Sequence, residues 1–306
     1  MAYAFTHPAR SVQKELRRIA RRQIDNAIAT IDAHGPIAHT VHDLRKRCKK
    51  VRGAIRMVRP CFADYARENA AFRDAAQSLS FLRDADVMVA TYDAIAEKHR
   101  GGMRRFAPIR NSLAERQKED VRDKQAIAHC LAALRATMTE ARSRAEDWRL
   151  DADGFEAFEG GLAKTWKRAR RGMRAAAIHG HALDFHEWRK RVKYHGYHAR
   201  LLEPVWPREL KAHRKAAETL NDLLGAHHDI AVFESVLRGQ RDTFGNADID
   251  GFVALLDERQ EALALEAFAI GRRLLAEPPE MLVRRWREWC TVWHKEGLEQ
   301  QAALAA

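Results

Sequence analysis

Hydrophobic residues recur at spacings of three and four along most of this chain, a pattern typical of amphipathic helices. The stretch 41–59, with the sequence VHDLRKRCKKVRGAIRMVR, shows the pattern most clearly. Its apolar stripe runs through Leu44, Cys48, Val51, Ile55 and Val58. A second stripe at the same spacing is basic and consists of His42, Arg45, Lys49, Arg52 and Arg56. The expected helix is therefore apolar along one face and cationic along another.

The same design returns in the second half of the chain. The stretch 185–203 reads FHEWRKRVKYHGYHARLLE, and aligning its His186 with His42 preserves the order of the cations. The aligned pairs are Arg45 with Arg189, Lys46 with Lys190, and Lys49 with Lys193. Trp188 falls on the apolar side of this second helix, and Arg200 falls on its basic side. A chance match of this kind is rare, so internal duplication is the simplest explanation.

The remaining segments also have a helical pattern, and glycine and proline residues fall between them, as at Pro278-Pro279. No segment shows the sustained alternation of apolar and polar residues that is typical of half-buried strands. The sequence therefore predicts an all-α protein of about ten helices in two related bundles. We expect one domain over residues 1–306, with a first half at 1–150 and a second half at 151–306.

Charge narrows the range of partners. The chain has 54 lysine and arginine residues against 42 aspartate and glutamate residues, which gives a formal net charge of +12. This balance favours an acidic partner such as nucleic acid, polyphosphate or an anionic membrane. No apolar stretch reaches the length of a membrane span, and the N-terminal sequence lacks the apolar core of a signal peptide. We therefore expect a cytoplasmic protein that does not associate with a membrane.

The two basic stripes are candidates for an anion-binding site. Cations three and four residues apart on a helix repel each other, and the run from His42 to Arg59 contains a single acid, Asp43. A solvated surface would explain one such run, but two copies with the same spacing favour a ladder of cations for an extended polyanion. Basic segments at 9–34 and 155–177 add further cations. The candidate anion-binding residues are Arg17, Arg21, His42, Arg45, Lys46, Lys49, Arg52, Arg56, Arg171, His186, Arg189, Lys190, Lys193 and Arg200.

The basic stripes lie beside apolar stripes, so we expect them to line one concavity between helices that both His42 and His186 face. An unperturbed histidine titrates near 6.5. Phosphate oxygens beside the two rings would raise their pKa, and affinity for the anion would then increase as the pH falls from about 8 toward 6.

Each half also carries an aspartate at nearly the same separation from its histidine. This residue is Asp84 in the first half and Asp229 in the second. A carboxylate that faces a polyanion would repel it. We therefore expect these aspartates to cap helices or to pair with arginines as structural support.

Together these motifs resemble the CHAD family, the conserved histidine α-helical domain. The first-half pattern of that family, H-x-x-R-x-x-x-R-R-x-R, is matched by His42, Arg45, Lys49, Lys50 and Arg52, with lysine at two of the basic positions. The second-half pattern, H-x-L-R-K-x-x-K-x-x-R-Y, is matched by His186, Arg189, Lys190, Lys193 and Tyr197. In this second copy Trp188 replaces leucine, and Gly196 stands where arginine is usual, which removes one cation.

The resemblance implies both an architecture and a ligand. It implies two four-helix bundles related by a pseudo-twofold axis, with a basic central channel or surface, and binding of inorganic polyphosphate. On this basis we expect a polyphosphate-binding protein that needs no cofactor. An association with polyphosphate granules is compatible with that ligand.

A metal-dependent phosphohydrolase is one alternative. His42-Asp43 and His228-Asp229 look like fragments of a metal site, but the cations three and seven residues after His42 would repel a divalent metal. The four cysteines form no CxxC pair, so they indicate neither a zinc site nor a disulfide framework. We therefore expect no metal and no enzymatic activity.

A nucleic-acid-binding protein is the main alternative. Exposed cations on helices suit a phosphate backbone, but the basic stripes contain few aromatic residues on which bases could stack. We expect Trp166, Trp188 and Trp206 to lie in the hydrophobic core instead. Nucleic acid is therefore the weaker candidate ligand.

Overall fold

The computed structural model describes residues 3–6, 10–99, 103–120, 124–245 and 247–305, without the side chains of 81–85, 118–120 and 305. This part of the chain forms eleven α-helices joined by short turns, and it contains no strand. The prediction of an all-α protein is confirmed, with slightly more helices than the sequence pattern indicated.

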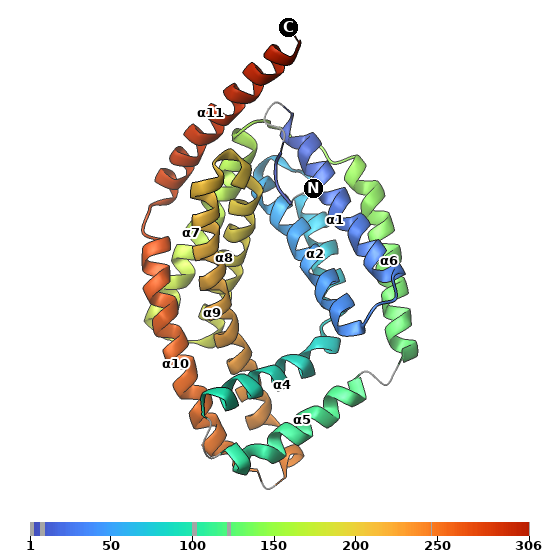
Figure 1. Ribbon diagram of the computed structural model, residues 1–306, viewed down its shortest axis with the longest axis vertical. Coiled ribbons are helices and arrows are strands. Elements are labelled where there is room, and N and C mark those ends of the chain that lie inside the picture. Colours follow the sequence, from blue (N-terminus) through green and yellow to red (C-terminus); the bar gives the residue numbers. More distant parts are fainter. Residues whose placement is uncertain (1–2, 7–9, 100–102, 121–123, 246, 306) are drawn as a thin grey trace.

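The helices fall into two groups that lie side by side (Figure 1). The first group contains α1 (Val12–Asp32), α2 (Ile37–Met57), α3 (Tyr65–Gln77) and α6 (Lys124–Glu146). The second group contains α7 (Glu156–His179), α8 (Ala182–Leu202), α9 (Pro207–Gly239) and α10 (Ile249–Leu274). The helices α4 (Phe81–Lys98) and α5 (Ala107–Asp120) extend from the first group toward the second. There they pack with α9 and α10 in a small second hydrophobic core.

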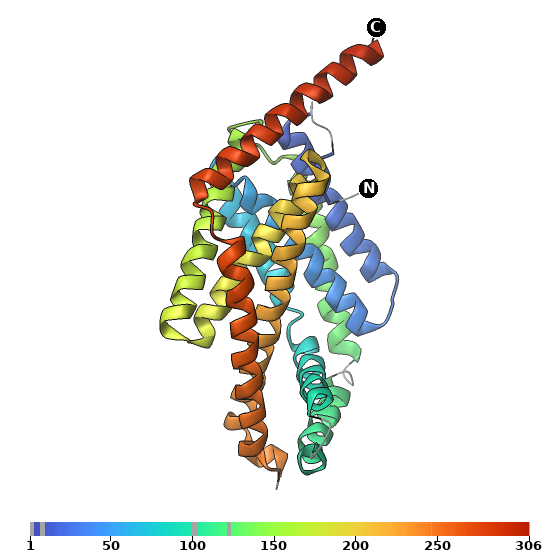
Figure 2. The ribbon, with the colours of Figure 1, turned by 60° about the vertical axis from the view of Figure 1, so that its left-hand side comes forward.

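The last helix, α11 (Pro279–Ala305), packs against α7 and then projects away from the rest of the molecule (Figure 2). Short 3-10 turns interrupt the chain at η1 (Arg59–Cys61), η2 (Met103–Phe106), η3 (Glu203–Val205) and η4 (Arg241–Phe244). The first and third of these turns follow directly after α2 and α8, so both basic helices end in the same way.

Local chemistry accounts for several helix ends. The Ser11 side chain accepts a hydrogen bond from the backbone N–H of Lys14 at the start of α1, and Asp248 does the same for Gly251 at the start of α10. Helix α7 ends at Gly180, whose φ of 70° lies in the left-handed region that glycine adopts without strain.

The apolar stripes of α2 and α8 face the core, as their spacing predicted. The buried members of the two stripes are Leu44, Cys48, Val51, Ile55, Val58, Trp188, Val192, His195, Ala199 and Leu202. Trp166 is also buried, but Trp206 is 43% exposed, so its predicted place in the core is wrong. Trp206 lies at the break between α8 and α9, where its ring packs edge-on against Trp289 at a centroid distance of 4.9 Å.

Glycines bring α7 close to both basic helices. A Cβ atom at Gly161 would lie 1.8 Å from the carbonyl oxygen of Met57 at the end of α2. A Cβ atom at Gly172 would lie 2.8 Å from the Cα atom of Trp188 in α8. Any larger residue would collide with backbone at these points, so the two glycines set how closely α7 packs against α2 and α8.

Candidate functional site

The basic stripes of α2 and α8 line a continuous hollow between the two groups of helices. Two adjoining cavities of about 380 Å³ and 510 Å³ make up this hollow. Both cavities are lined by Arg45 and Lys49 from α2 and by Arg189, Lys193 and Tyr197 from α8. We call the combined hollow the basic cleft.

His42 and His186 lie at different ends of the basic cleft. His42 lines one cavity together with Lys46, and His186 lines the other together with Lys190 and His228. Helix α9 contributes further lining residues, namely Ala217, Glu218, Asn221, Asp222, His228, Asp229 and Val232. Each histidine therefore lines a different cavity of the basic cleft, and a shared site for both stays a prediction.

Helix α3 holds two of the cleft arginines in place. The Arg45 guanidinium donates from Nη1 to the carbonyl oxygen of Ala76 at 2.7 Å. Arg52 donates from Nε to the Oδ1 atom of Asn69 at 3.2 Å. Such bonds restrict the conformations of long side chains, so less entropy is lost when an anion binds.

Two carboxylates near the cleft, Glu218 and Glu187, pair with neighbouring cations. Glu218 accepts hydrogen bonds from Arg214, the shorter of which is 2.6 Å. Glu187 accepts hydrogen bonds from both Lys190 and Arg191 on its own helix. The described residues that line both cavities include four cations and no carboxylate, so positive charge dominates there, while Asp222 lines one cavity and Asp229 lines the other.

The surroundings of His186 disfavour its charged form. Its ring centroid lies 4.2 Å from that of His228, and its Nδ1 atom is buried with no hydrogen-bond partner among the described residues. Burial, followed by the neighbouring His228, Lys190 and Arg189, lowers the pKa of His186 to about 4. The expected ordinary value is therefore wrong for this histidine, which is neutral at pH 7 in the free protein.

Three of the predicted anion-binding residues belong to other helices and lie outside the lining of the basic cleft. Arg17 donates from Nε to the carbonyl oxygen of Trp148 at 2.7 Å, and Arg21 pairs with Glu146 at 3.5 Å. These contacts join α1 to the last residue of α6 and to the segment just after it. Arg171 is exposed on α7. The sequence shows that these three residues are basic, but the spacing within each helix does not show which neighbouring helix they face.

Arg56 and Arg200 belong to the basic helices but also lie outside the lining. Arg56 is only 8% exposed and donates from Nη2 to the Oδ1 atom of Asn69 at 2.9 Å. Arg200 lies near Lys50, whose pKa falls to about 8 through burial and then through the charges of Lys46 and Arg200. Arg56 therefore supports the wall of the cleft from behind.

The structure also brings in residues that the sequence pattern did not mark as anion-binding. Arg73 and Gln77 reach the cleft from α3, and Asn221 reaches it from α9. Tyr197 follows Lys193 by one helical turn, so the spacing of the basic stripe could have indicated it. No periodic signal marks Arg73, because it belongs to a helix without a basic stripe.

The two aspartates expected as structural support can be placed only in part. Asp229 lies on the wall of the basic cleft at the end that contains His186. The side chain of Asp84 lies outside the described residues. A supporting role for the two aspartates stays a prediction.

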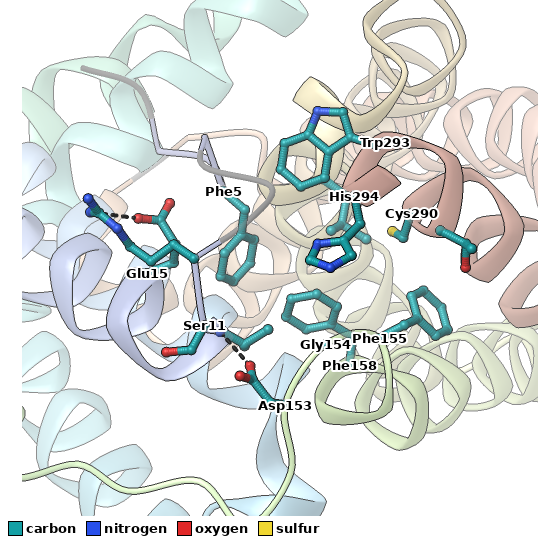
Figure 3. A pocket seen from close by; sticks show the side chains of 14 residues that line it. Phe5, Ser11, Glu15, Asp153, Gly154, Phe155, Phe158, Cys290, Trp293 and His294 are labelled. Atoms are coloured by element: carbon teal, nitrogen blue, oxygen red, sulfur yellow. Dashed lines mark hydrogen bonds and ion pairs between the residues drawn. The ribbon is translucent and has the colours of Figure 1, made fainter. Parts of the chain in front are cut away.

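A separate cavity of about 260 Å³ lies where the N-terminal segment meets α7 and α11 (Figure 3). The rings of Phe5, Phe158 and Trp293 line it. Glu15, which also lines it, accepts hydrogen bonds from Arg18. None of the candidate anion-binding residues lines this cavity, so we do not assign it to a polyanion.

Two further observations concern the alternatives raised by the sequence. Within the described ranges, no group of three or more histidine, cysteine, aspartate or glutamate residues is arranged to hold a metal ion. None of the helices in this part of the chain combines the length and the apolar character needed to cross a membrane.

Comparison with known proteins identifies a similar fold and the family of the chain. PptA from Streptomyces chartreusis has a similar structure, with a TM-score of 0.58 and 14% sequence identity, over 86% of this chain and 100% of that chain. At this identity the likeness shows a shared fold. No curated protein matches the chain. The CHAD domain model matches residues 18–238, a range that includes both basic helices and most of the chain. As its motifs predicted, the chain belongs to the CHAD domain family.

Proposed function

We propose that this protein binds inorganic polyphosphate in the basic cleft without acting on it chemically. The observation that carries the proposal is that cations of α2 and α8 line one continuous hollow between the two groups of helices. Membership of the CHAD family supports the same ligand. The proposal involves no metal, cofactor or catalytic residue. We further propose that the protein is cytoplasmic and associates with polyphosphate granules.

A linear chain of phosphates suits this arrangement of charges. Arg45, Lys49 and Arg52 extend over about 10 Å of α2 at the helical rise per residue, so successive phosphates can meet successive cations. Arg189 and Lys193 supply cations from α8 to the same space. Charge-assisted hydrogen bonds to phosphate oxygens are about twice as strong as those between neutral groups. Bound phosphates would also relieve the repulsion among the cations.

Nucleic acid suits the cleft less well. The ring of Tyr194 already lies under the guanidinium of Arg56, at 4.2 Å from its centroid. Tyr197 packs edge-on against Tyr3 at a centroid distance of 5.9 Å. These rings are therefore poor platforms for stacked bases. A DNA duplex also carries its phosphates on a stiff helix, whereas a single phosphate chain can bend to follow the cleft.

Replacing Arg45 and Arg189 together with alanine should weaken polyphosphate binding by at least about tenfold. Each well-formed hydrogen bond to a charged group contributes about 1.5–3 kcal/mol, and the two arginines line both cavities of the cleft. Isothermal titration calorimetry would measure the affinity, and circular dichroism would show whether the helices remain intact.

The matched control for this experiment is Arg272→Ala with Arg273→Ala. These two arginines are exposed at the end of α10, and their replacement removes the same net charge. The control should bind polyphosphate nearly as the original protein does. Equal affinity in the Arg45→Ala/Arg189→Ala variant and the original protein would show that the basic cleft is an ordinary solvated surface.

Replacing Gly196 with arginine should strengthen binding by about threefold to tenfold. A Cβ atom at Gly196 would meet only the Cβ atom of Ala217, at an ordinary contact distance of 3.8 Å, and the position lines the cleft. The nearby Glu218 and Asp222 would compete for the new cation, which limits the gain. Gly196→Gln is the uncharged control, and equal binding by the two variants would refute a role for charge at this position.

Polyphosphate affinity should increase as the pH falls from about 7 to about 5, by at most about tenfold per pH unit for each proton taken up. Bound phosphate favours the charged form of His186, so its pKa rises from the value of about 4 in the free protein. Between the free and bound pKa values, binding takes up a proton, and affinity therefore grows as the pH falls through that interval. Titrations in buffers of different ionisation enthalpy would measure the uptake.

The His186→Gln variant should show a shallower pH dependence, because glutamine cannot take up the proton. The Arg45→Ala variant should bind more weakly but keep the slope. A slope that survives replacement of both His186 and His42 with glutamine would exclude these histidines as its source.

A further inference from the structure

A second group of cations gathers where α7 crosses the end of α2. Arg59 comes from the turn η1, and Lys164 and Arg168 lie one helical turn apart on α7. The contact at Gly161 brings the α7 backbone against the carbonyl group of Met57 and so places these three cations near one another. We call Arg59, Lys164 and Arg168 the outer cationic group.

Within the described part of the chain, no acid is paired with a cation of the outer cationic group. The Nε and Nη2 atoms of Arg59 are buried and have no hydrogen-bond partner in the described part of the chain. Burial lowers the pKa of Arg59 to about 10 and the charge of Arg168 lowers it further, whereas the charge of Tyr65 and a side-chain hydrogen bond with Tyr65 raise it. Arg59 and then burial lower the pKa of Lys164. Among the described residues, none of the three cations forms an ion pair with a carboxylate.

The unpartnered atoms of Arg59 have the geometry that an oxyanion needs. Nε and Nη2 lie on one edge of the planar guanidinium, and this edge can donate two parallel hydrogen bonds to a phosphate group. A bound phosphate would satisfy both buried donors and would screen Arg59 from Lys164 and Arg168. An unpaired buried donor is unfavourable, so a ligand that pairs it gains the corresponding free energy.

A row of cations connects the outer cationic group to the basic cleft. Arg52 lines the cleft, Arg56 follows it by four residues on α2, and Arg59 follows Arg56 by three residues in the turn η1. Arg52 and Arg56 both donate to Asn69, and both guanidinium groups lie over the ring of Tyr194, at 6.0 Å and 4.2 Å from its centroid. The row therefore carries positive charge from the cleft toward Arg59, although its middle member, Arg56, is only 8% exposed.

We propose that the outer cationic group binds phosphates of a long polyphosphate chain whose other part occupies the basic cleft. This proposal rests on the proposed function and adds a preference for polymer length. Arg59 follows Arg52 by seven residues and lies in the turn just beyond the end of α2, on the order of 10 Å from Arg52 at the helical rise. A short chain held in the cleft therefore does not reach it. A long chain anchored in the cleft presents its next phosphates at high effective concentration and gains affinity from the second contact.

The test compares two ligands, tripolyphosphate and long-chain polyphosphate, on the variant Lys164→Ala/Arg168→Ala. Both residues are exposed, so their replacement leaves the core unchanged. We expect the affinity for the long chain to fall about tenfold while the affinity for tripolyphosphate stays unchanged. The dependence of the long-chain affinity on salt should also become less steep, because fewer counterions are released. Arg59→Gln, which removes the two-donor edge, should have the same selective effect.

The controls separate this proposal from the proposed function. Arg272→Ala/Arg273→Ala removes the same charge elsewhere and should leave both affinities unchanged. Arg45→Ala/Arg189→Ala should weaken both ligands, because both use the cleft. An unchanged long-chain affinity in Lys164→Ala/Arg168→Ala, or an equal loss for both ligands, would overturn the role of the outer cationic group while leaving the cleft proposal intact. Failure of the original protein to bind either ligand would overturn both proposals.

Discussion

The basic cleft depends on holding the two basic helices, α2 and α8, next to each other against the repulsion between their cations. Like charges one turn apart on a helix cost a few tenths of a kcal/mol per pair, and cations from a neighbouring helix add to this cost. The apolar stripes of the same helices offset it, because a fully buried large side chain contributes about 1.5–3 kcal/mol. Leu44 and Val51 of α2 and Trp188 and Val192 of α8 are such residues. The hydrophobic core thus maintains a concentration of charge that a polyanion can neutralise.

The balance between hydrophobic burial and charge repulsion explains how the basic cleft could favour an anion without a separate pocket for each phosphate. Hydrogen bonds to the protein help to fix the cations, as where Arg45 donates from Nη1 to the carbonyl oxygen of Ala76. His186 adds no charge at pH 7 in the free protein, because burial and neighbouring cations keep it neutral. In the proposed complex, a bound phosphate favours the proton, and His186 then becomes a cation. The outer cationic group extends the same principle, since Arg59 keeps two donors buried and unpartnered.

The sequence predicted the helical class and the basic stripes well, because both depend on spacing within one helix. The duplication added the expectation that His42 and His186 face a common space. Contacts between helices could not be predicted in this way. Arg17 looked like other stripe arginines, yet it bonds the carbonyl group of Trp148, and Arg73 of α3 lines the cleft without any periodic signal. The pKa of His186 was also inaccessible, because it depends on burial and on His228 of another helix.

The central claim is that the basic cleft selects a flexible phosphate chain over other polyanions. The most direct measurement is competition at matched salt between long-chain polyphosphate and duplex DNA, compared at equal phosphate concentration, because salt alone changes the affinity of any polyanion. The account predicts that DNA leaves most of the polyphosphate bound and that the remaining weak DNA binding is little affected by Arg45→Ala/Arg189→Ala. Efficient displacement of polyphosphate by DNA would contradict the account, and the basic cleft would then be a general surface for nucleic acids.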